Sequence, residues 1–224
     1  MTQVLRVMVE SGKKKVVAVA FDWIGWERSG TSEADALRVL ADYRRRYDRV
    51  AELAGLAPDF HAAVEPEVVE RIEGTSTTDF YGISTRSVST EYAPMTDAEC
   101  ERKIRLLRAC WAYFDETALR VSAEMRKGPR GGGRDRDQIV RHTLGSEGWE
   151  MAKKVHMKTP PAEVLNPDGL RAYRERYCDA LRDYNARGAP ALSWTVQFTI
   201  RRSAYHMLDH AWEMEDKDLS RAGQ

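Results

Sequence analysis

Two histidines near the carboxyl end of the chain have the spacing of metal ligands. His206 and His210 form an H-x-x-x-H pair inside a segment with helical periodicity. Residues four apart lie on one helix face, about one turn from each other, so a single divalent ion can contact both imidazoles. The alternative is an ordinary solvated helix face, because Thr199, Ser203 and Asp209 share the same polar stripe.

A third histidine, His142, lies in an earlier segment that also has helical periodicity. Its helix face also carries Ile139 and Trp149. The alternative to a metal ligand is therefore a structural histidine at the edge of the core. Three imidazoles from two facing helices would leave coordination positions open for water or substrate, which is the layout of a catalytic site. Neutral imidazole suits zinc, nickel, iron and copper, and the spacing does not choose among them.

Charged side chains near these histidines are the candidates for catalysis. Glu213 shares the face of the H-x-x-x-H pair, so it can orient a ligand imidazole or act as a general base. Glu147 and Asp209 are weaker candidates for the orienting role. Arg202 can pair with an anionic substrate. For each of these residues the alternative is a solvated surface charge.

The stretch 127–136 is the most unusual in composition, with four glycines and four basic residues. Its backbone N–H groups lead into an expected helix and can hold a carboxylate or a phosphate, with Arg130 and Arg134 as substrate-binding residues. It lacks the G-x-x-x-x-G-K-[ST] pattern, so it does not support nucleotide hydrolysis. Trp149 can wall the same pocket and exclude water. A flexible turn and ordinary packing are the alternatives.

The elements that must position these residues are helices, because the apolar residues recur every three or four positions after residue 95. Capping boxes, an Asn-Pro start and helix-stopping glycines mark their ends. Four amphipathic helices are expected to run from Thr96 to Gly128, from Asp135 to about Lys154, from Asn166 to Gly188, and from a Ser193 cap to about Asp216.

Before residue 95 the pattern is that of strands and turns. Two valine-rich runs, 4–9 and 16–21, flank Gly12 and predict a β-hairpin. Gly25 and Gly30 indicate loops, and a helix capped by Thr31 or Ser32 is expected to end before Gly55. A third strand is expected near 67–72, followed by a loop over 74–94 that is rich in Ser, Thr and Gly.

Composition narrows the class of protein. The 224 residues include 35 Lys plus Arg and 35 Asp plus Glu, so a zero net charge gives no support for nucleic-acid binding. No apolar run approaches the roughly 20 residues of a membrane span, and we expect no signal peptide. Cys100, Cys110 and Cys178 are odd in number and lack C-x-x-C spacing, which argues against a disulfide framework and favours a cytoplasmic protein.

The segments 134–142 and 201–213, together with the four expected helices, resemble the DinB superfamily. That superfamily includes bacterial mycothiol- and bacillithiol-type S-transferases and related maleylpyruvate isomerases. Its pattern has one histidine early in the second helix and H-x-x-x-H in the last, which implies that His142, His206 and His210 hold one divalent transition metal (zinc, nickel or iron). The resemblance covers just over half the chain and implies a low-molecular-weight thiol as co-substrate.

The amino-terminal motifs at 21–26, 29–33 and 36–37 are similar to the small HicB-like β-β-α module. In toxin–antitoxin pairs that module belongs to the antitoxin. The DNA-binding part that accompanies it there is missing from this chain, so we expect an accessory or lid module and no nucleic-acid partner.

The expected architecture is α+β, with a β-β-α module over 1–73, a linker over 74–95, a four-helix up-and-down-type bundle over 96–216 and a tail over 217–224. The expected function is that of a metal-dependent enzyme that activates a thiol or water toward a small-molecule substrate, with thiol S-transfer favoured. A hydrolase, isomerase or lyase that uses the same site is the first alternative. A non-catalytic binding protein with the bundle as scaffold is the second, and homodimerisation stays open.

Overall fold

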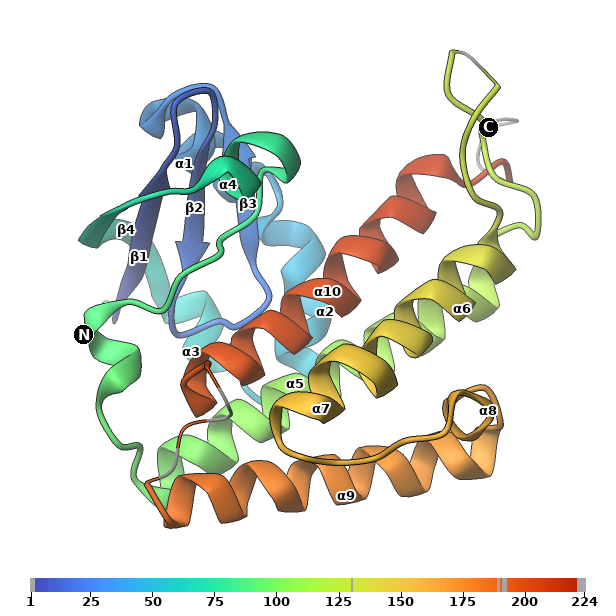
Figure 1. Cartoon of the computed structure of the whole chain (residues 1–224). Coiled ribbons are helices and arrows are strands. Elements are labelled where there is room, and N and C mark those ends of the chain that lie inside the picture. Colours follow the sequence, from blue (N-terminus) through green and yellow to red (C-terminus); the bar gives the residue numbers. More distant parts are fainter. Residues whose placement is uncertain (1–2, 130, 189, 191–192, 221–224) are drawn as a thin grey trace.

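The computed structural model of the chain describes residues 3–129, 131–188, 190 and 193–220 (Figure 1). It has the predicted mixed α+β class, with one four-stranded sheet in the amino-terminal part and helices mostly in the carboxyl-terminal part. No helix among these residues is long and apolar enough to cross a membrane. The strands are β1 (Gln3–Ser11), β2 (Val16–Ala20), β3 (Glu27–Gly30) and β4 (Ala63–Glu73). The α-helices are α1 (Glu33–Asp42), α2 (Arg44–Leu53), α3 (Ala57–Ala62), α4 (Ser76–Tyr81), α5 (Asp97–Arg120), α6 (Arg136–Ser146), α7 (Ala152–Lys154), α8 (Pro161–Val164), α9 (Pro167–Ala186) and α10 (Val196–Lys217).

The sheet has the strand order β3-β2-β1-β4. The predicted hairpin of β1 and β2 is confirmed, since the two strands pair antiparallel with Val9 opposite Ala18. The predicted third strand is also confirmed, but it is longer than expected and pairs parallel to β1 as β4. The expectation that Gly30 indicates a loop was wrong, because residues 27–30 form β3. Its short polar sequence, ERSG, gives no strand signal.

The expected single helix of the amino-terminal part is two helices. Ser32 caps α1 by accepting a hydrogen bond from the Asp35 backbone N–H at 3.2 Å, as predicted. The chain bends at Tyr43, which ends α1 and begins α2, and α2 ends at Leu53, before Gly55. The observed order is therefore β-β-β-α-α-α-β, and the expected β-β-α module accounts for only part of it.

The stretch 74–94 contains structure that the sequence did not predict. It forms α4 and a 3₁₀ turn, η1 (Ser89–Tyr92), where only a loop was expected. Thr75 caps α4, and Asp79 accepts hydrogen bonds from the backbone N–H groups of Lys13, Lys14 and Lys15 at 2.6–3.1 Å. Thr and Asp form these local bonds as readily in ordered turns as in irregular loops, so composition alone could not separate the two.

Both predicted capping boxes of the carboxyl-terminal part are present, at Thr96 and Asp135. The helix α5 ends at Arg120, earlier than expected, because Val121 takes an extended conformation. The helix that starts at α6 continues to Lys154, as predicted, but it passes through a π-helical turn, η2 (Glu147–Met151).

The starts of the last two helices were predicted with different success. Asn166 caps α9, as the Asn-Pro pair indicated. The predicted cap of the last helix at Ser193 was wrong, since the Thr195 side chain accepts from the Phe198 N–H and α10 begins at Val196. Both candidates are hydroxyl residues two positions apart, which sequence reasoning separates poorly.

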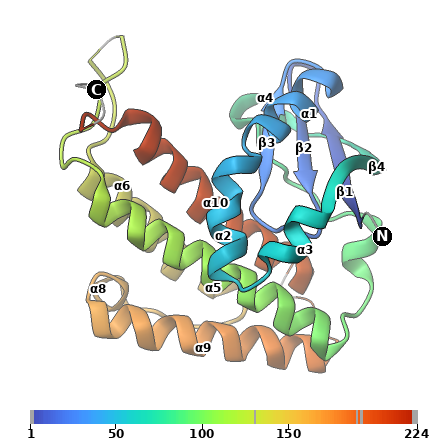
Figure 2. The same ribbon diagram turned by 180° about the vertical axis from the view of Figure 1, so that it is seen from behind.

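The helix α10 lies at the centre of the molecule, with the sheet on one side and α6 and α9 on the other (Figures 1 and 2). It packs against α5, α6 and α9, and the buried apolar residues of these helices form one continuous core with those on one face of the sheet, while Met8, Val17 and Val19 on the other face belong to a separate small cluster. Gly25 allows the amino-terminal part to approach closely, because a Cβ atom there would lie 3.0 Å from the Ala204 backbone and its φ is +87°.

A buried cluster of charges joins α10 to the amino-terminal part. The Arg201 guanidinium donates to both carboxylate oxygens of Glu91 at 2.7 and 3.1 Å and to Glu27 at 3.4 Å. It also donates to Ser84 Oγ and to the Arg86 carbonyl, each at 3.0 Å. Burial raises the pKa of Glu27 to about 7, against the opposing effect of the Arg201 charge. This cluster fixes β3 and the segment 84–91 against α10.

We expect Arg201→Ala to destabilise the fold by about 3–5 kcal/mol, because it leaves two buried carboxyl groups without their cation. Urea unfolding measures the change. The matched control is Arg38→Ala. Arg38 pairs with Asp35 and Asp42 on the surface of α1, so its removal should change the free energy of unfolding little. Equal losses in the two variants would contradict the stabilising role of the cluster.

A second buried carboxyl group lies inside the carboxyl-terminal helices. Glu147 is 1% exposed at the start of η2, where it accepts a hydrogen bond from the indole N–H of Trp111 through Oε1. Its Oε2 has no hydrogen-bond partner among the described residues. Burial raises the pKa of Glu147 to about 7, although the nearby Arg174 charge opposes the shift. The carboxyl group is therefore neutral in mildly acidic solution.

This raised pKa gives stability a specific pH dependence. Between the ordinary pKa of 4.5 and the folded value of about 7, the unfolded chain releases a proton that folded Glu147 keeps. Stability falls as pH rises through this window, by about 3 kcal/mol. We expect Glu147→Gln to remove that contribution from the pH profile of urea unfolding, while Glu150→Gln, at an exposed neighbour, leaves the profile as it is. An unchanged profile in Glu147→Gln would contradict the assignment.

Candidate metal centre

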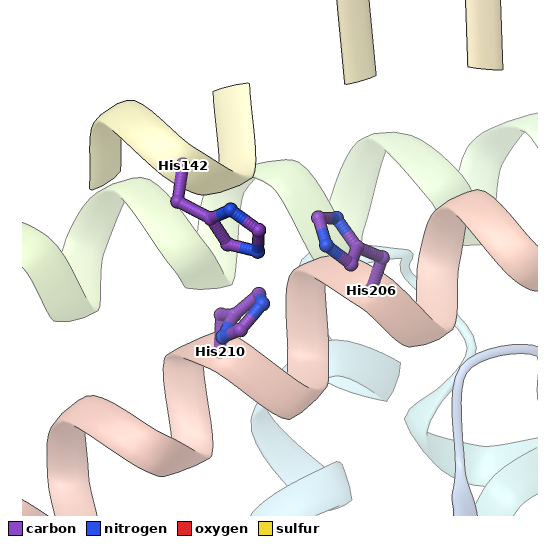
Figure 3. Close-up of side chains that lie close together, drawn as sticks. All are labelled: His142, His206 and His210. Carbon is purple, nitrogen blue, oxygen red and sulfur yellow. The ribbon is translucent and has the colours of Figure 1, made fainter. Parts of the chain in front are cut away.

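The three predicted ligand histidines lie together between α6 and α10. One nitrogen from each of His142, His206 and His210 can be chosen so that all lie within 4.8 Å of one another. The ring centroids are 5.6 Å apart for His142 and His206, 5.0 Å for His142 and His210, and 4.7 Å for His206 and His210. Figure 3 shows the three rings pointing toward one another, His142 from α6 and the other two from α10.

Local helix structure explains this placement. The capping box at Asp135 fixes the start of α6, so His142 lies two turns into the helix and faces α10. The four-residue spacing in α10 places His206 and His210 on one face, one above the other. Imidazole ligands lie about 2.0–2.1 Å from a bound ion, so the rings would have to move closer together than they are here to hold one.

A carboxylate holds one of the imidazoles in place. His210 Nδ1 lies 2.7 Å from Glu213 Oε2. Burial alone would raise the pKa of Glu213, but hydrogen bonds from His210 and Lys217 outweigh it and lower the pKa to about 2. An ionised carboxylate only accepts hydrogen bonds, so Nδ1 of His210 carries the hydrogen of this contact and Nε2 is the nitrogen left to face a metal ion. Glu213 therefore occupies the orienting position that the sequence predicted for it.

The remaining two imidazoles lie in surroundings that disfavour protonation. Burial lowers the pKa of His206 well below its ordinary value, and the His210 ring and the Arg202 charge add to the effect. The pKa of His142 is lowered by partial burial and by Arg134. His206 Nδ1 is buried and has no hydrogen-bond partner among the described residues. Neutral imidazoles with unused nitrogens are the form that binds zinc, nickel or iron, so the donor set fits a transition metal.

The histidines open into a cavity of about 440 Å³. Part of its wall comes from the amino-terminal part, namely β3 and the chain around the end of α4. Tyr81, at that end, is 65% exposed. The lining residues are Arg28, Ser29, Tyr81, Gly82, Ile83, Arg134, His142, Arg202, Tyr205, His206, Asp209, His210 and Glu213. Segments far apart in the sequence thus complete one site.

Two of the three arginines in this cavity are already paired. Arg28 donates to Asp209 at 3.0 Å, and its guanidinium lies over the rings of Tyr43 and Trp212, 3.9 and 4.1 Å from their centroids. Arg28 was not predicted as a cavity residue, because no sequence pattern marks it and its position depends on how β3 packs on α10. Arg134 donates to Glu213 at 3.2 Å.

The third arginine, Arg202, keeps unused hydrogen-bonding capacity. Its Nη1 is buried and has no hydrogen-bond partner among the described residues. Its guanidinium lies over the Tyr205 ring, 5.2 Å from the centroid. A buried donor without a partner is costly, so an anionic group of a ligand is the natural partner at this point of the cavity.

The other predicted residues take different places. Arg130 lies outside the described residues. Trp149 does not line the histidine cavity and lies instead at a separate cavity, 72% exposed. Asp209 pairs with Arg28, and Glu147 is bonded to Trp111, so neither contacts a ligand histidine through a hydrogen bond. Sequence reasoning could not place Trp149, because its orientation depends on the π-helical turn.

The three cysteines are all buried and free. Burial raises the pKa of Cys100 to about 11 and that of Cys178 to about 12. Burial also raises the pKa of Cys110. Each therefore behaves as a small apolar side chain at neutral pH, as predicted for Cys110, and none lines the histidine cavity.

Comparisons with known protein families, with curated proteins and with solved structures gave no match for this chain.

We expect Glu213→Gln to weaken zinc binding about 10- to 100-fold, because the amide keeps the shape of the side chain but loses the charge that orients His210. Competition with a chromogenic chelator measures the affinity. Asp216→Asn, an exposed acid further along α10 that does not line the cavity, is the control and should bind zinc as the parent does. Equal affinities in all three proteins would contradict the orienting role.

Proposed function

We propose that this chain is a metal-dependent enzyme in which His142, His206 and His210 hold one divalent transition metal (zinc, nickel or iron). The observation that carries the proposal is the convergence of three imidazole nitrogens within 4.8 Å at the edge of a solvent-open cavity. A carboxylate that orients His210 and the neutral state of His206 support it. Three protein ligands leave positions for substrate, as in catalytic sites.

Within this proposal, α5, α6, α9 and α10 form a four-helix up-and-down-type bundle of the DinB kind. Their mutual packing, with one histidine on α6 and two on α10, supports that assignment. The amino-terminal part then acts as the HicB-like accessory module. Its contribution of Arg28 and Tyr81 to the cavity wall supports a role in closing the site.

The chemistry follows from the donor set. A divalent metal bound there would lower the pKa of a thiol or water that it coordinates, and so supply a nucleophile near neutral pH. Glu213 keeps the His210 ring in the ligand orientation and can take up a proton released in the cavity only weakly, given its low pKa. Arg202 would bind an anionic group of the substrate through its free Nη1. Arg134 would bind the same anionic group once its hydrogen bond to Glu213 is replaced by one to the substrate.

Transfer of an external low-molecular-weight thiol to an electrophilic small molecule is the favoured reaction. All three cysteines are buried with raised pKa values, so a thiolate must come from outside the chain. The cavity volume of about 440 Å³ suits a small thiol and a small electrophile. Hydrolysis with water in place of the thiol is the second candidate on the same residues.

Metal content tests the proposal first. Protein purified without an affinity tag should carry about one equivalent of a transition metal by mass spectrometry, and His206→Ala/His210→Ala should lose it while keeping the circular dichroism of the parent. The matched control is His61→Ala/His156→Ala, which removes two histidines that do not line the cavity. No metal in the parent, even after addition of zinc or nickel, would overturn the proposal.

Activity assays then separate the two candidate reactions. S-transfer would be supported if the parent consumes an electrophile only when a thiol is added, and if His206→Ala/His210→Ala does not consume it. Turnover without thiol that shows the same dependence on the histidines would assign hydrolysis instead. No turnover of either kind by the metal-loaded protein would favour a binding role.

A further inference from the structure

Trp149 lies at a second cavity, which is separate from the histidine site. This cavity has a volume of about 570 Å³ and is formed by the π-helical turn η2, by α7 and by the chain that follows. It shares no lining residue with the histidine cavity among the described residues. Trp149 is 72% exposed, which is unusual for an indole ring. A large aromatic surface is therefore open to a ligand.

The charge around this ring is positive. Lys153 and Lys158 line the cavity together with His156. No acidic side chain of the described part of the chain lines it, and neither lysine forms an ion pair there. Glu150, adjacent to the tryptophan, is exposed but is not a lining residue. An anionic group in the cavity would meet two ammonium groups without competition from a carboxylate.

The walls of the cavity are well fixed. Gly148 packs so closely that a Cβ atom there would lie 3.0 Å from Val164 Cγ1, which holds η2 against α8. His156 has a left-handed backbone, with φ of +55°, and its ring stacks on Tyr184 at 6.3 Å and 17°. π-Helical turns are rare and occur often at functional sites. The ring of Trp149 is thus presented by ordered backbone on both sides.

A hydrogen-bonding group at this cavity is unused. Thr159 is a lining residue of this cavity, and its hydroxyl is buried and has no hydrogen-bond partner within the described ranges. A buried hydroxyl without a partner is costly, so it favours a ligand that can bond to it. The cavity therefore combines a stacking surface, two cations and a free hydroxyl.

We propose that this cavity binds a mononucleotide. Its base would stack on the Trp149 indole, and its phosphate would contact Lys153 and Lys158, with the Thr159 hydroxyl as an additional hydrogen-bonding group. Every base has a π-face, so stacking accepts any of them, and ammonium groups are common phosphate ligands. This site does not depend on the metal.

A small ligand fits better than a nucleic acid. The chain as a whole has zero net charge, with 35 basic and 35 acidic residues, so its composition gives no support for an extended basic surface of the kind that follows a nucleic-acid backbone. One exposed tryptophan and two lysines provide contacts for one base and its phosphate, not for a strand.

Calorimetric titration of the full-length protein with adenosine 5′-monophosphate, at low salt and in the presence of a metal chelator, tests the proposal. We expect one saturable site that Trp149→Ala weakens about 5- to 100-fold, because the stacking surface is lost. Trp149→Phe should keep most of the affinity, and Lys153→Glu/Lys158→Glu should lose it. Because these side chains are exposed, the variants should fold.

Two control variants distinguish this cavity from the histidine site and from stacking on any exposed ring. Tyr92→Ala, which removes a ring that is 71% exposed elsewhere, and His206→Ala/His210→Ala should bind the nucleotide as the parent does. Absence of saturable binding by the parent, or equal binding by Trp149→Ala, would overturn the proposal. Tighter binding of a single-stranded oligonucleotide than of the mononucleotide would also overturn it and assign the surface to nucleic acid.

Discussion

The buried guanidinium of Arg201 is the constraint on which much of this structure depends. It is 1% exposed and reaches Glu91, Glu27, Ser84 and the Arg86 carbonyl, so it joins α10 to β3 and to the segment after α4. Charges in the protein interior must be paired, which leaves few other ways to dock these segments. The residues next to this cluster, Arg28 and Arg202, consequently face the histidine cavity. The cluster thus determines which parts of the amino-terminal region wall the candidate metal site.

The electrostatics of the histidine site follow from the same packing. Because α10 is buried along most of its length, His206 is partly shielded from solvent, and this burial lowers its pKa well below the ordinary value. Glu213 stays ionised because His210 and Lys217 donate to it, and this fixes the ring whose other nitrogen faces the cavity. The site therefore places His142 and His206, whose pKa values are lowered, beside an anionic group that orients His210, an arrangement that suits a divalent cation.

Much of the site could be predicted from sequence, and the parts that could not depend on tertiary packing. The spacing of His206 and His210 and the capping box before His142 are local features, so helix geometry alone placed these residues on useful faces. The hairpin, β4 and the helix starts at Thr96 and Asn166 were predicted for the same reason. The strand β3, the helix α4 and the contribution of Arg28 depend on contacts with distant segments. Trp149 was assigned to the wrong cavity because the π-helical turn has no recognisable sequence signal.

The most direct test of the central claim is to locate the metal. Crystals of the metal-loaded protein, measured at the absorption edge of the bound element, give an anomalous difference map. We expect one strong peak enclosed by the rings of His142, His206 and His210, with a side open to the cavity that Arg202 and Tyr81 line. A peak held by other residues, or a site closed by a fourth protein ligand, would contradict the claim.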